Sequence, residues 1–358
     1  MIIYTLKKIT YGILVLWGVL TLVFFLFNIL PGDPARMMLD KREDSSQLAV
    51  IKHKYGFDRS LPEQYVLYLN DVSPISIHYN STTAFTSLVN KQYNYTRLFN
   101  LSKYTIVLKY PYLRESFVQI GTPVSIILVD TFRNTFILAF SSILFALILG
   151  LILGAFAALY KDTLMDKLIL FISVLGMSLP SFFASIIIAW FFGFVLHKYT
   201  GLNMTGNLYE VDDYGSGSFL QIKNLILPAV TLGIRPLAVI IQLCRNSLLD
   251  VLSMDYIRTA TAKGLRSSVV ILRHALSNAL NPVVTAVSGW FGSMLAGAVF
   301  VEYIFAWNGI GKEIVDALNK MDLPVVMGSV LLIASVFVII NIIVDLIYGW
   351  LDPRVRIS

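Results

Sequence analysis

The chain has 358 residues, of which 56% are hydrophobic and 14% are charged, and its formal net charge is +6. Because a soluble globular domain carries about 25% charged residues, this composition excludes an ordinary soluble protein and predicts a membrane protein. Cys244 is the single cysteine, which excludes an internal disulfide and a thiolate metal site.

Long apolar runs indicate how the chain crosses the membrane. About twenty apolar residues span the hydrocarbon core of a bilayer as a helix. One further run, 224–244, is interrupted only by Arg235. The runs without any charged residue are 9–30, 134–160, 168–196, 282–301 and 323–344. We therefore expect an all-α, multi-pass membrane protein with six transmembrane helices.

The distribution of lysine and arginine predicts the orientation. Cytoplasmic loops are rich in these residues, and long outer loops cross the membrane largely regardless of charge. With both termini in the cytoplasm, the short outer loops carry four lysines and no arginine, namely Lys198, Lys223, Lys312 and Lys320. The first run follows Lys7 and Lys8, but it is too long for a cleaved signal peptide, so we interpret it as an uncleaved anchor.

The predicted spans divide the chain into three parts. Residues 1–30 hold the N-terminal segment and the first span, and residues 131–358 hold the other five. Between them, 31–130 is predicted to be a small extracytoplasmic α/β region, with an amphipathic helical stretch at 44–68 and a strand at 104–110. This region either caps the membrane domain or docks an extracytoplasmic partner, and the sequence leaves both open.

Small residues and prolines mark where the spans pack and bend. Gly150 and Gly154 form a GxxxG pattern that predicts close helix packing in the second span. Pro180 is expected to interrupt the third span, and Pro228 and Pro236 the fourth. The fifth span places small residues four apart, which suits internal packing, a dimer interface or a moving pathway; the candidate pathway residues there are Gly289, Gly292, Ser293 and Gly297.

No catalytic machinery is recognisable in the sequence. The phosphate-binding pattern GxxxxGK[ST] and the patterns HExxH, CxxC and GxSxG are missing, and the four histidines are scattered. We therefore expect a chain that is not an enzyme, has no catalytic residue, and binds no cofactor, metal or nucleic acid itself.

Arg235 is the one charge deep within a predicted span. Intramembrane arginines usually face a bundle interior or a water-filled cavity. Either Arg235 lines the translocation pathway and contacts a carboxylate or carbonyl of the cargo, or it pairs with helix-end carbonyls or with an acid such as Glu302.

A polar, basic loop at 249–280 separates the fourth and fifth spans and is predicted to lie in the cytoplasm. Ser253 is expected to cap a helix whose first turn holds Asp255 and whose last turn holds Lys263. Gly264 stands where a left-handed residue ends a helix, and a second amphipathic stretch follows. This helical hairpin is either an interfacial element or a docking surface for a partner.

Residues 255–265 (DYIRTATAKGL), followed by Arg273-His274-Ala275-Leu276, resemble the EAA loop of ABC importer permeases. The resemblance is to the first (B-type) membrane subunit of the dipeptide/oligopeptide/nickel family, and it extends over nearly the whole chain. Two features depart from the family pattern: Leu276-Ser277 replaces Leu-Pro, and the outer segment is longer, with 73–112 as the expected insertion. The other matching segments are 30–34 (LPGDP), 227–229 (LPA), 307–311 (WNGIG), 322–326 (DLPVV) and 351–354 (LDPR).

The resemblance implies a function and a location in the plasma membrane of a bacterium or archaeon. Such a chain forms half of a pore with a second homologous permease, receives cargo from an extracytoplasmic solute-binding protein, and is driven by two ATPase subunits that bind ATP and Mg. It implies that the loop is the helix that couples the pore to an ATPase. The residues expected at that contact are Asp255, Tyr256, Arg258, Thr259, Ala260, Ala262, Lys263 and Gly264.

The resemblance favours import of di- or oligopeptides. Import of a nickel chelate or another small solute is the alternative within this class. The alternatives outside this class are an ion channel, a stand-alone secondary carrier and a sensory or scaffold protein. Secondary carriers usually show inverted repeats and acidic residues at mid-membrane, and this sequence shows neither.

Overall fold

A computed structural model describes the chain except for residue 1 and residues 30–44, 82–84, 89–93, 212–216 and 352–358. The family-matching segment 30–34 (LPGDP) and residues 352–354 of the segment 351–354 (LDPR) lie outside the described residues. The chain divides into two units, and we treat each by itself. The first comprises Met1–Ile13, Thr131–Lys312 and Ile333–Ser358, and the second comprises Leu14–Asp130 and Glu313–Leu332.

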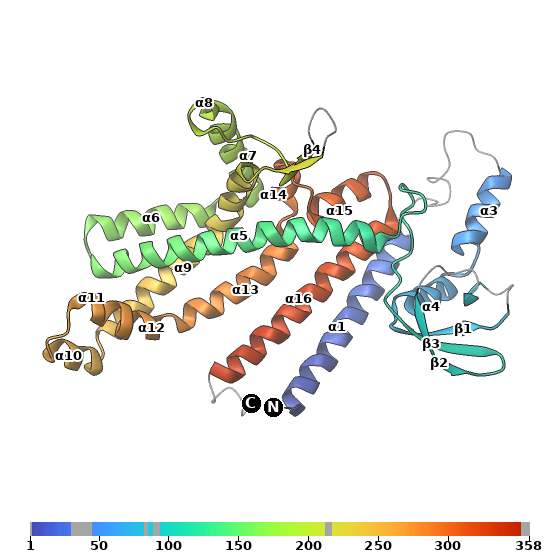
Figure 1. Cartoon of the computed structure of the whole chain (residues 1–358), viewed down its shortest axis with the longest axis horizontal. Coiled ribbons are helices and arrows are strands. Elements are labelled where there is room, and N and C mark those ends of the chain that lie inside the picture. The colour runs from blue at the N-terminus through green and yellow to red at the C-terminus, as the bar shows by residue number, and fades with distance from the viewer. Residues whose placement is uncertain (1, 30–44, 82–84, 89–93, 212–216, 352–358) are drawn as a thin grey trace. The chain divides into compact units, whose positions relative to one another are not determined.

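The protein is mostly helical (Figure 1). Among the described residues, four helices are each long and apolar enough to cross a membrane, and a bent pair raises the number to five. The bent pair is α6 (Leu164–Ser178) with the helix that follows it. The four single helices are α1 (Ile2–Ile29), α5 (Val124–Leu159), α9 (Lys223–Leu252) and α16 (Leu323–Leu351).

The remaining predicted span coincides with a shorter helix. Helix α13 (Asn281–Gly297) has 17 residues and is followed by α14 (Val299–Ile304). At 1.5 Å per residue α13 is about 25 Å long, slightly less than a hydrocarbon core of about 30 Å.

The prolines interrupt the helix in the third predicted span but not in the fourth. Helix α6 ends at Ser178 and α7 (Ser181–Trp190) begins directly after Pro180, with a bend of 109° between the two segments, so the predicted interruption is confirmed. Helix α9, in contrast, runs unbroken through Pro228 and Pro236, and the predicted interruption of the fourth span is wrong. A membrane helix tolerates proline when neighbouring groups compensate for the lost backbone bond.

The predicted close packing of the second span is confirmed. A Cβ on Gly150 would lie 2.6 Å from Ile240 Cγ2, and a Cβ on Gly154 would lie 2.7 Å from Cys244 Cβ, both on α9. The two glycines therefore allow the backbones of α5 and α9 to approach closely.

Shorter elements complete the first unit. The π-helix η2 (Phe191–Val195) and α8 (His197–Thr200) follow α7, and the antiparallel pair β4 (Tyr209–Val211) and β5 (Ser218–Leu220) precedes α9. After α9 come α10 (Asp255–Ala262), α11 (Ser267–Val269), the π-helix η3 (Val270–Ala275) and α12 (Leu276–Ala279).

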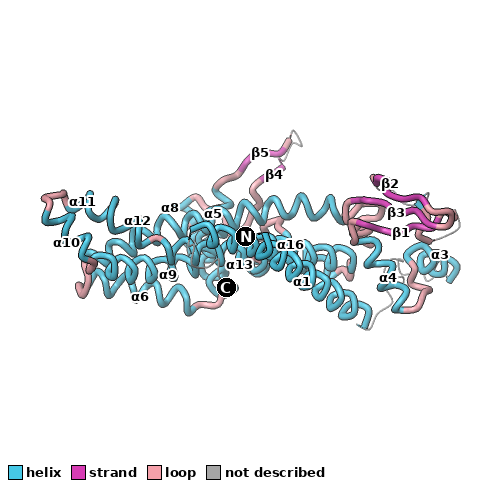
Figure 2. The backbone as a smooth tube through the Cα atoms, turned by 90° about the horizontal axis from the view of Figure 1, so that it is seen from below, coloured by secondary structure: helices cyan, strands magenta, loops and turns pink. Residues whose placement is uncertain are grey.

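The second unit contains an antiparallel sheet in the order β1-β3-β2, as Figure 2 shows. The strands are β1 (Ile75–Tyr79), β2 (Tyr95–Asn100) and β3 (Tyr104–Lys109), so the strand expected at 104–110 is confirmed. The expected helical stretch 44–68 is two helices, α3 (Ser45–Tyr55) and α4 (Leu61–Val72). Gly56, at φ +75, follows α3, and a capping box of Ser60 and Glu63 starts α4.

A buried aspartate orders one loop of the second unit. Asp322, which precedes α16, accepts hydrogen bonds from the backbone of Phe117 at 3.0 Å and Val118 at 3.3 Å, and from the hydroxyl of Ser116. Helix α15 (Ile310–Asn319) precedes this residue.

Candidate functional site

The loop between α9 and α13 is a compact helical hairpin, formed by α10 on one side of Gly264 and by α11, η3 and α12 on the other. We call these elements the hairpin (Figure 1). Gly264 has φ +79, a left-handed conformation that costs an L-residue strain, so the predicted break at this glycine is confirmed. No atom lies within 4 Å of a Cβ built there, so backbone conformation is the reason for glycine.

The expected start of the first hairpin helix is wrong. Helix α9 extends to Leu252, and the Ser253 hydroxyl donates back to the Asp250 carbonyl at 2.7 Å instead of capping α10. Met254 occupies the N-cap position and provides no side-chain hydrogen bond. Asp255 lies in the first turn as predicted, where its charge complements the helix dipole.

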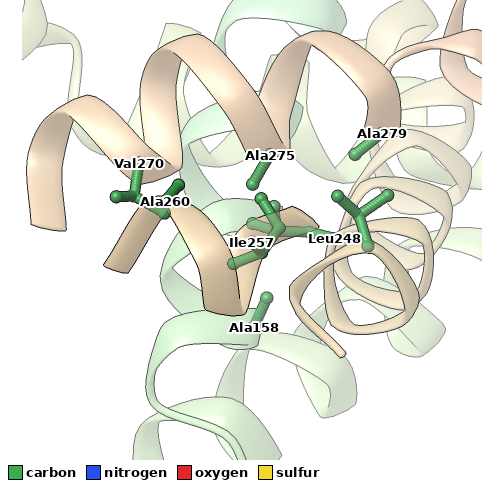
Figure 3. Packing of buried hydrophobic residues seen from close by; sticks show 8 residues of the cluster. Ala158, Leu248, Ile257, Ala260, Val270, Ala275 and Ala279 are labelled. Atoms are coloured by element: carbon green, nitrogen blue, oxygen red, sulfur yellow. The ribbon is translucent and has the colours of Figure 1, made fainter. Parts of the chain in front are cut away.

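An apolar cluster holds the hairpin together and joins it to the membrane helices (Figure 3). Ile257 and Ala260 of α10 are 5% and 8% exposed, and they pack with residues of η3 and α12. Leu248 on α9 and Ala158 on α5 belong to the same cluster. A force on α10 is therefore transmitted to α9 and α5, because close-packed side chains leave little space for independent movement.

The outer face of α10 and the turn present polar and small groups to solvent. Of the eight predicted coupling residues, Ala260 alone is buried and belongs to the packing cluster. The other seven are exposed: Asp255, Tyr256, Arg258, Thr259, Ala262, Lys263 and Gly264. We call these seven residues the outer face of the hairpin.

Two side-chain contacts order this face. The hydroxyl of Tyr256 accepts a hydrogen bond from Asn278 Nδ2 at 3.0 Å, which ties α10 to α12 across the hairpin. Arg258 and Asp255 form an exposed pair at 3.5 Å, one helical turn apart. An exposed pair of this kind contributes little to stability, so its charges remain available to a partner.

The sequence-predicted pathway residues do not all lie together. A cavity of about 120 Å³ is lined by residues of α6, α7, α9 and α13, and it includes Arg235 and Ser293. Gly289 and Gly292 are not among its lining residues. A Cβ on Gly292 would lie 3.3 Å from Ile340 Cγ2, so this glycine serves packing against α16. Gly297 ends α13, and its surroundings lie outside the described part of the structure.

The expected alternative in which Arg235 pairs with Glu302 is wrong. Glu302 is fully buried and accepts hydrogen bonds from the Thr135 hydroxyl at 2.6 Å and from the backbone of Gly311 at 2.7 Å and Lys312 at 3.2 Å. Its carboxylate therefore holds the start of α15 against α5. In the described residues, Arg235 has no hydrogen bond or ion pair.

Two sets of polar contacts between distant parts of the chain were not predicted from the sequence. Arg245 on α9 forms a bidentate ion pair with buried Asp166 at the start of α6, with both distances 2.7 Å. Trp307 Nε1 donates to the Asn134 carbonyl at 3.1 Å, and Asn134 Nδ2 donates to the Asn308 carbonyl at 2.8 Å. Polar residues within or next to apolar runs were the available signal, but their partners are distant in the sequence.

The chemistry available at these sites is binding and coupling. Within the described residues, no group of three or more His, Cys, Asp or Glu is placed to hold a metal ion. The hairpin offers an exposed surface joined rigidly to two membrane helices, and the cavity offers a cationic group between helices.

Family models cover nearly the whole chain. Residues 150–357 match the model described as binding-protein-dependent transport system inner membrane component, and residues 1–139 match its N-terminal counterpart. The match to the first model alone covers more than half of the chain.

Curated relatives agree with this match over nearly their full lengths. The dipeptide transport system permease protein DppB of Alkalihalophilus pseudofirmus is 32% identical over 99% of this chain and 100% of its own. The di/tripeptide transport system permease protein DppB of Pseudomonas aeruginosa is 34% identical over 95% of this chain and 94% of its own. The glutathione transport system permease protein GsiC of Pectobacterium atrosepticum is 32% identical over 99% of both chains.

These matches confirm the resemblance that the loop at 255–265 first indicated. They account for a multi-pass membrane protein that works as a permease and is not itself an enzyme. The chain belongs to the family of binding-protein-dependent transport system inner membrane components, in the dipeptide permease branch of the ABC importers.

Proposed function

We propose that the chain is the membrane permease of an ATP-driven importer of di- or oligopeptides. Together with a second homologous permease it forms the translocation pathway, and two ATPase subunits and an extracytoplasmic solute-binding protein complete the transporter. The peptide cargo is supported by the relatives named as dipeptide and di/tripeptide permeases, which align with this chain over nearly its full length.

The observation that carries this proposal is the hairpin. Its outer face is exposed while its inner face packs on Leu248 of α9 and Ala158 of α5. An ATPase seated on the outer face moves α9, which also carries Arg235 in the cavity. Residues 235 and 252 are about 25 Å apart along one helix, so a displacement at the hairpin reaches the pathway through a single rigid element.

The mechanism needs ATP bound by the partner, because this chain has no phosphate-binding loop. ATP-driven closure of the two ATPases draws the two hairpins together, and the attached helices alternate between inward-open and outward-open arrangements. The importer reconstituted in vesicles with its binding protein should accumulate a dipeptide only when ATP and the ATPases are present. Dipeptide uptake by this chain without the ATPases would contradict the proposal, and uptake of a nickel chelate in place of the dipeptide would contradict the cargo.

The proposed arrangement has six transmembrane helices, with both termini and the hairpin in the cytoplasm and the region 31–130 outside. The single cysteine, Cys244, is buried, so it provides a silent background for cysteine labelling. Lys103 and Lys263 are both exposed and lie in the outer region and the hairpin respectively.

Cysteine labelling tests this topology directly. In intact cells, a membrane-impermeant maleimide should label Lys103→Cys and leave Lys263→Cys unlabelled, because the reagent cannot cross the bilayer. After permeabilisation both variants should react, and the unaltered chain should not react in either condition. Labelling of Lys263→Cys in intact cells would place the hairpin outside and rule out its contact with a cytoplasmic ATPase.

A further inference from the structure

The cavity beside Arg235 is built around a break between two helices. Pro180 separates α6 from α7, and the two segments diverge by 109° there. Gly176 near the end of α6, Ser181 at the start of α7, Arg235 on α9 and Ser293 on α13 all line the cavity. Its volume of about 120 Å³ is well above the ~10–15 Å³ that one water needs, so it admits a small polar group.

Hydrogen-bond donors converge on this cavity without partners. The guanidinium of Arg235 and the hydroxyls of Ser181 and Ser293 make no hydrogen bond to any described residue. The N-cap of α7 is Pro180, which supplies no side-chain acceptor, so the first N–H groups of α7 also remain uncapped. The positive end of the α7 dipole and the arginine therefore act at one place.

The described residues around the cavity offer no negative charge to balance Arg235, which is the only charged residue among those that line it. Acids on two helices that contact α9 are already engaged: Glu302 on α14 binds Thr135 and the start of α15, and Asp166 on α6 binds Arg245. An arginine near the middle of a span is retained when it faces a partner or a solute. Trp290 and Met294 also line the cavity and give it an apolar wall.

We infer that this cavity binds the carboxylate of the cargo in transit, with Arg235 as its charged ligand and Ser181 and Ser293 as hydrogen-bond donors. Under the proposed peptide function, on which this inference rests, that group is the C-terminal carboxylate of a peptide. A guanidinium binds a carboxylate through two parallel hydrogen bonds, which gives both charge and geometry for recognition. The apolar wall accommodates the adjoining side chain.

The test compares alanyl-alanine with its C-terminal amide in the complete transporter, reconstituted in vesicles with ATP and saturating binding protein. The binding protein discriminates between the two peptides by itself, but its contribution is the same for every variant of this chain and cancels from the comparison. In Arg235→Gln the uptake ratio of free peptide to amide should fall at least about tenfold, the size of a lost charge-assisted contact. Arg235→Lys, which keeps the charge but not the fork, should lose less.

Matched variants separate this role from a structural one. Arg97→Gln on β2 removes an exposed arginine outside the cavity and should leave the ratio unchanged. Ser181→Ala keeps the charge and should lower the ratio by a smaller factor; it also decides the question if Arg235→Gln does not reach the membrane. Equal slowing of both peptides would assign Arg235 to an ion pair with a neighbouring subunit and overturn the inference.

The outcomes also distinguish this inference from the proposed function. Wild-type vesicles that import neither peptide in the presence of ATP would contradict the peptide importer itself. Wild-type vesicles that import alanyl-alanine, with a ratio that Arg235→Gln and Ser181→Ala leave unchanged, would overturn the carboxylate site and leave the importer intact.

Discussion

Replacing Ala262 with arginine should abolish dipeptide uptake while leaving the chain folded in the membrane. Ala262 is exposed at the end of α10 on the outer face of the hairpin, so a larger side chain disturbs no internal packing. Exposed substitutions usually change the free energy of unfolding by less than about 0.5 kcal/mol. A bulky charge at the centre of a tight interface, in contrast, costs about 2 kcal/mol or more, which is sufficient to dissociate a transient partner.

Ala260 supplies the matched comparison, because it lies two positions away on the opposite face of the same helix. At 8% exposure it packs in the cluster with Ile257 and Leu248, and Ala260→Arg should reduce the amount of folded chain itself. The measurements are the level of this chain in membranes, co-purification of the ATPase, and uptake. Ala262→Ser should behave as the unaltered protein. Normal uptake by Ala262→Arg at normal protein levels would exclude the outer face from ATPase coupling.

Local signals in the sequence predicted several elements correctly, and the physical reason is that each depends on few neighbours. Gly264 ends a helix because its own backbone is left-handed, and Pro180 ends α6 because it cannot continue the helix. Gly150 and Gly154 predicted close packing because glycines spaced four residues apart in a span allow two helix backbones to approach closely.

The predictions that failed concern competition between local choices. Ser253 fits either the end of α9 or the start of α10, and its hydroxyl bonds to the Asp250 carbonyl, so α9 takes it. Pro228 and Pro236 stand within a helix that packs on several others, and tertiary packing overrides the local preference. The coupling role of Ala260 stays a prediction; its inward orientation depends on the phase of α10, which the short stretch does not determine and which the burial of Ile257 and Ala260 shows.

The contact between Glu302 and Thr135 could not be predicted from the sequence, for a different reason. Thr135 precedes Glu302 by 167 positions, and no periodicity connects them. Pairing of Glu302 with Arg235 is one of the alternatives that the sequence leaves open, beside helix-end carbonyls and a pathway role for the arginine. Backbone N–H groups at the start of α15 satisfy the carboxylate instead, which leaves Arg235 free for the cavity.

Removing the Glu302 carboxylate should be among the most destabilising single changes in the first unit. In Glu302→Ala, the N–H groups of Gly311 and Lys312 lose the acceptor that the fully buried Glu302 provides, and the Thr135 hydroxyl keeps only its 3.4 Å contact with the Thr131 carbonyl. Each unsatisfied buried group costs about 1–3 kcal/mol, so a total loss of several kcal/mol is expected. Thermal unfolding of the purified chain in detergent should show a large decrease in melting temperature.

Two further variants assign this loss to the hydrogen bonds. Glu302→Gln keeps one oxygen for the backbone donors and an amide that can face Thr135, so it should lose much less stability than Glu302→Ala. Thr135→Val removes the hydroxyl that donates to Glu302 and accepts from the Ile310 N–H at 2.8 Å, and it should lose an intermediate amount. Because the two residues share these contacts, the double variant Glu302→Ala/Thr135→Val should lose less than the sum of its parts. Additive losses, or an unchanged melting temperature in Glu302→Ala, would show that this network does not hold α15 to α5.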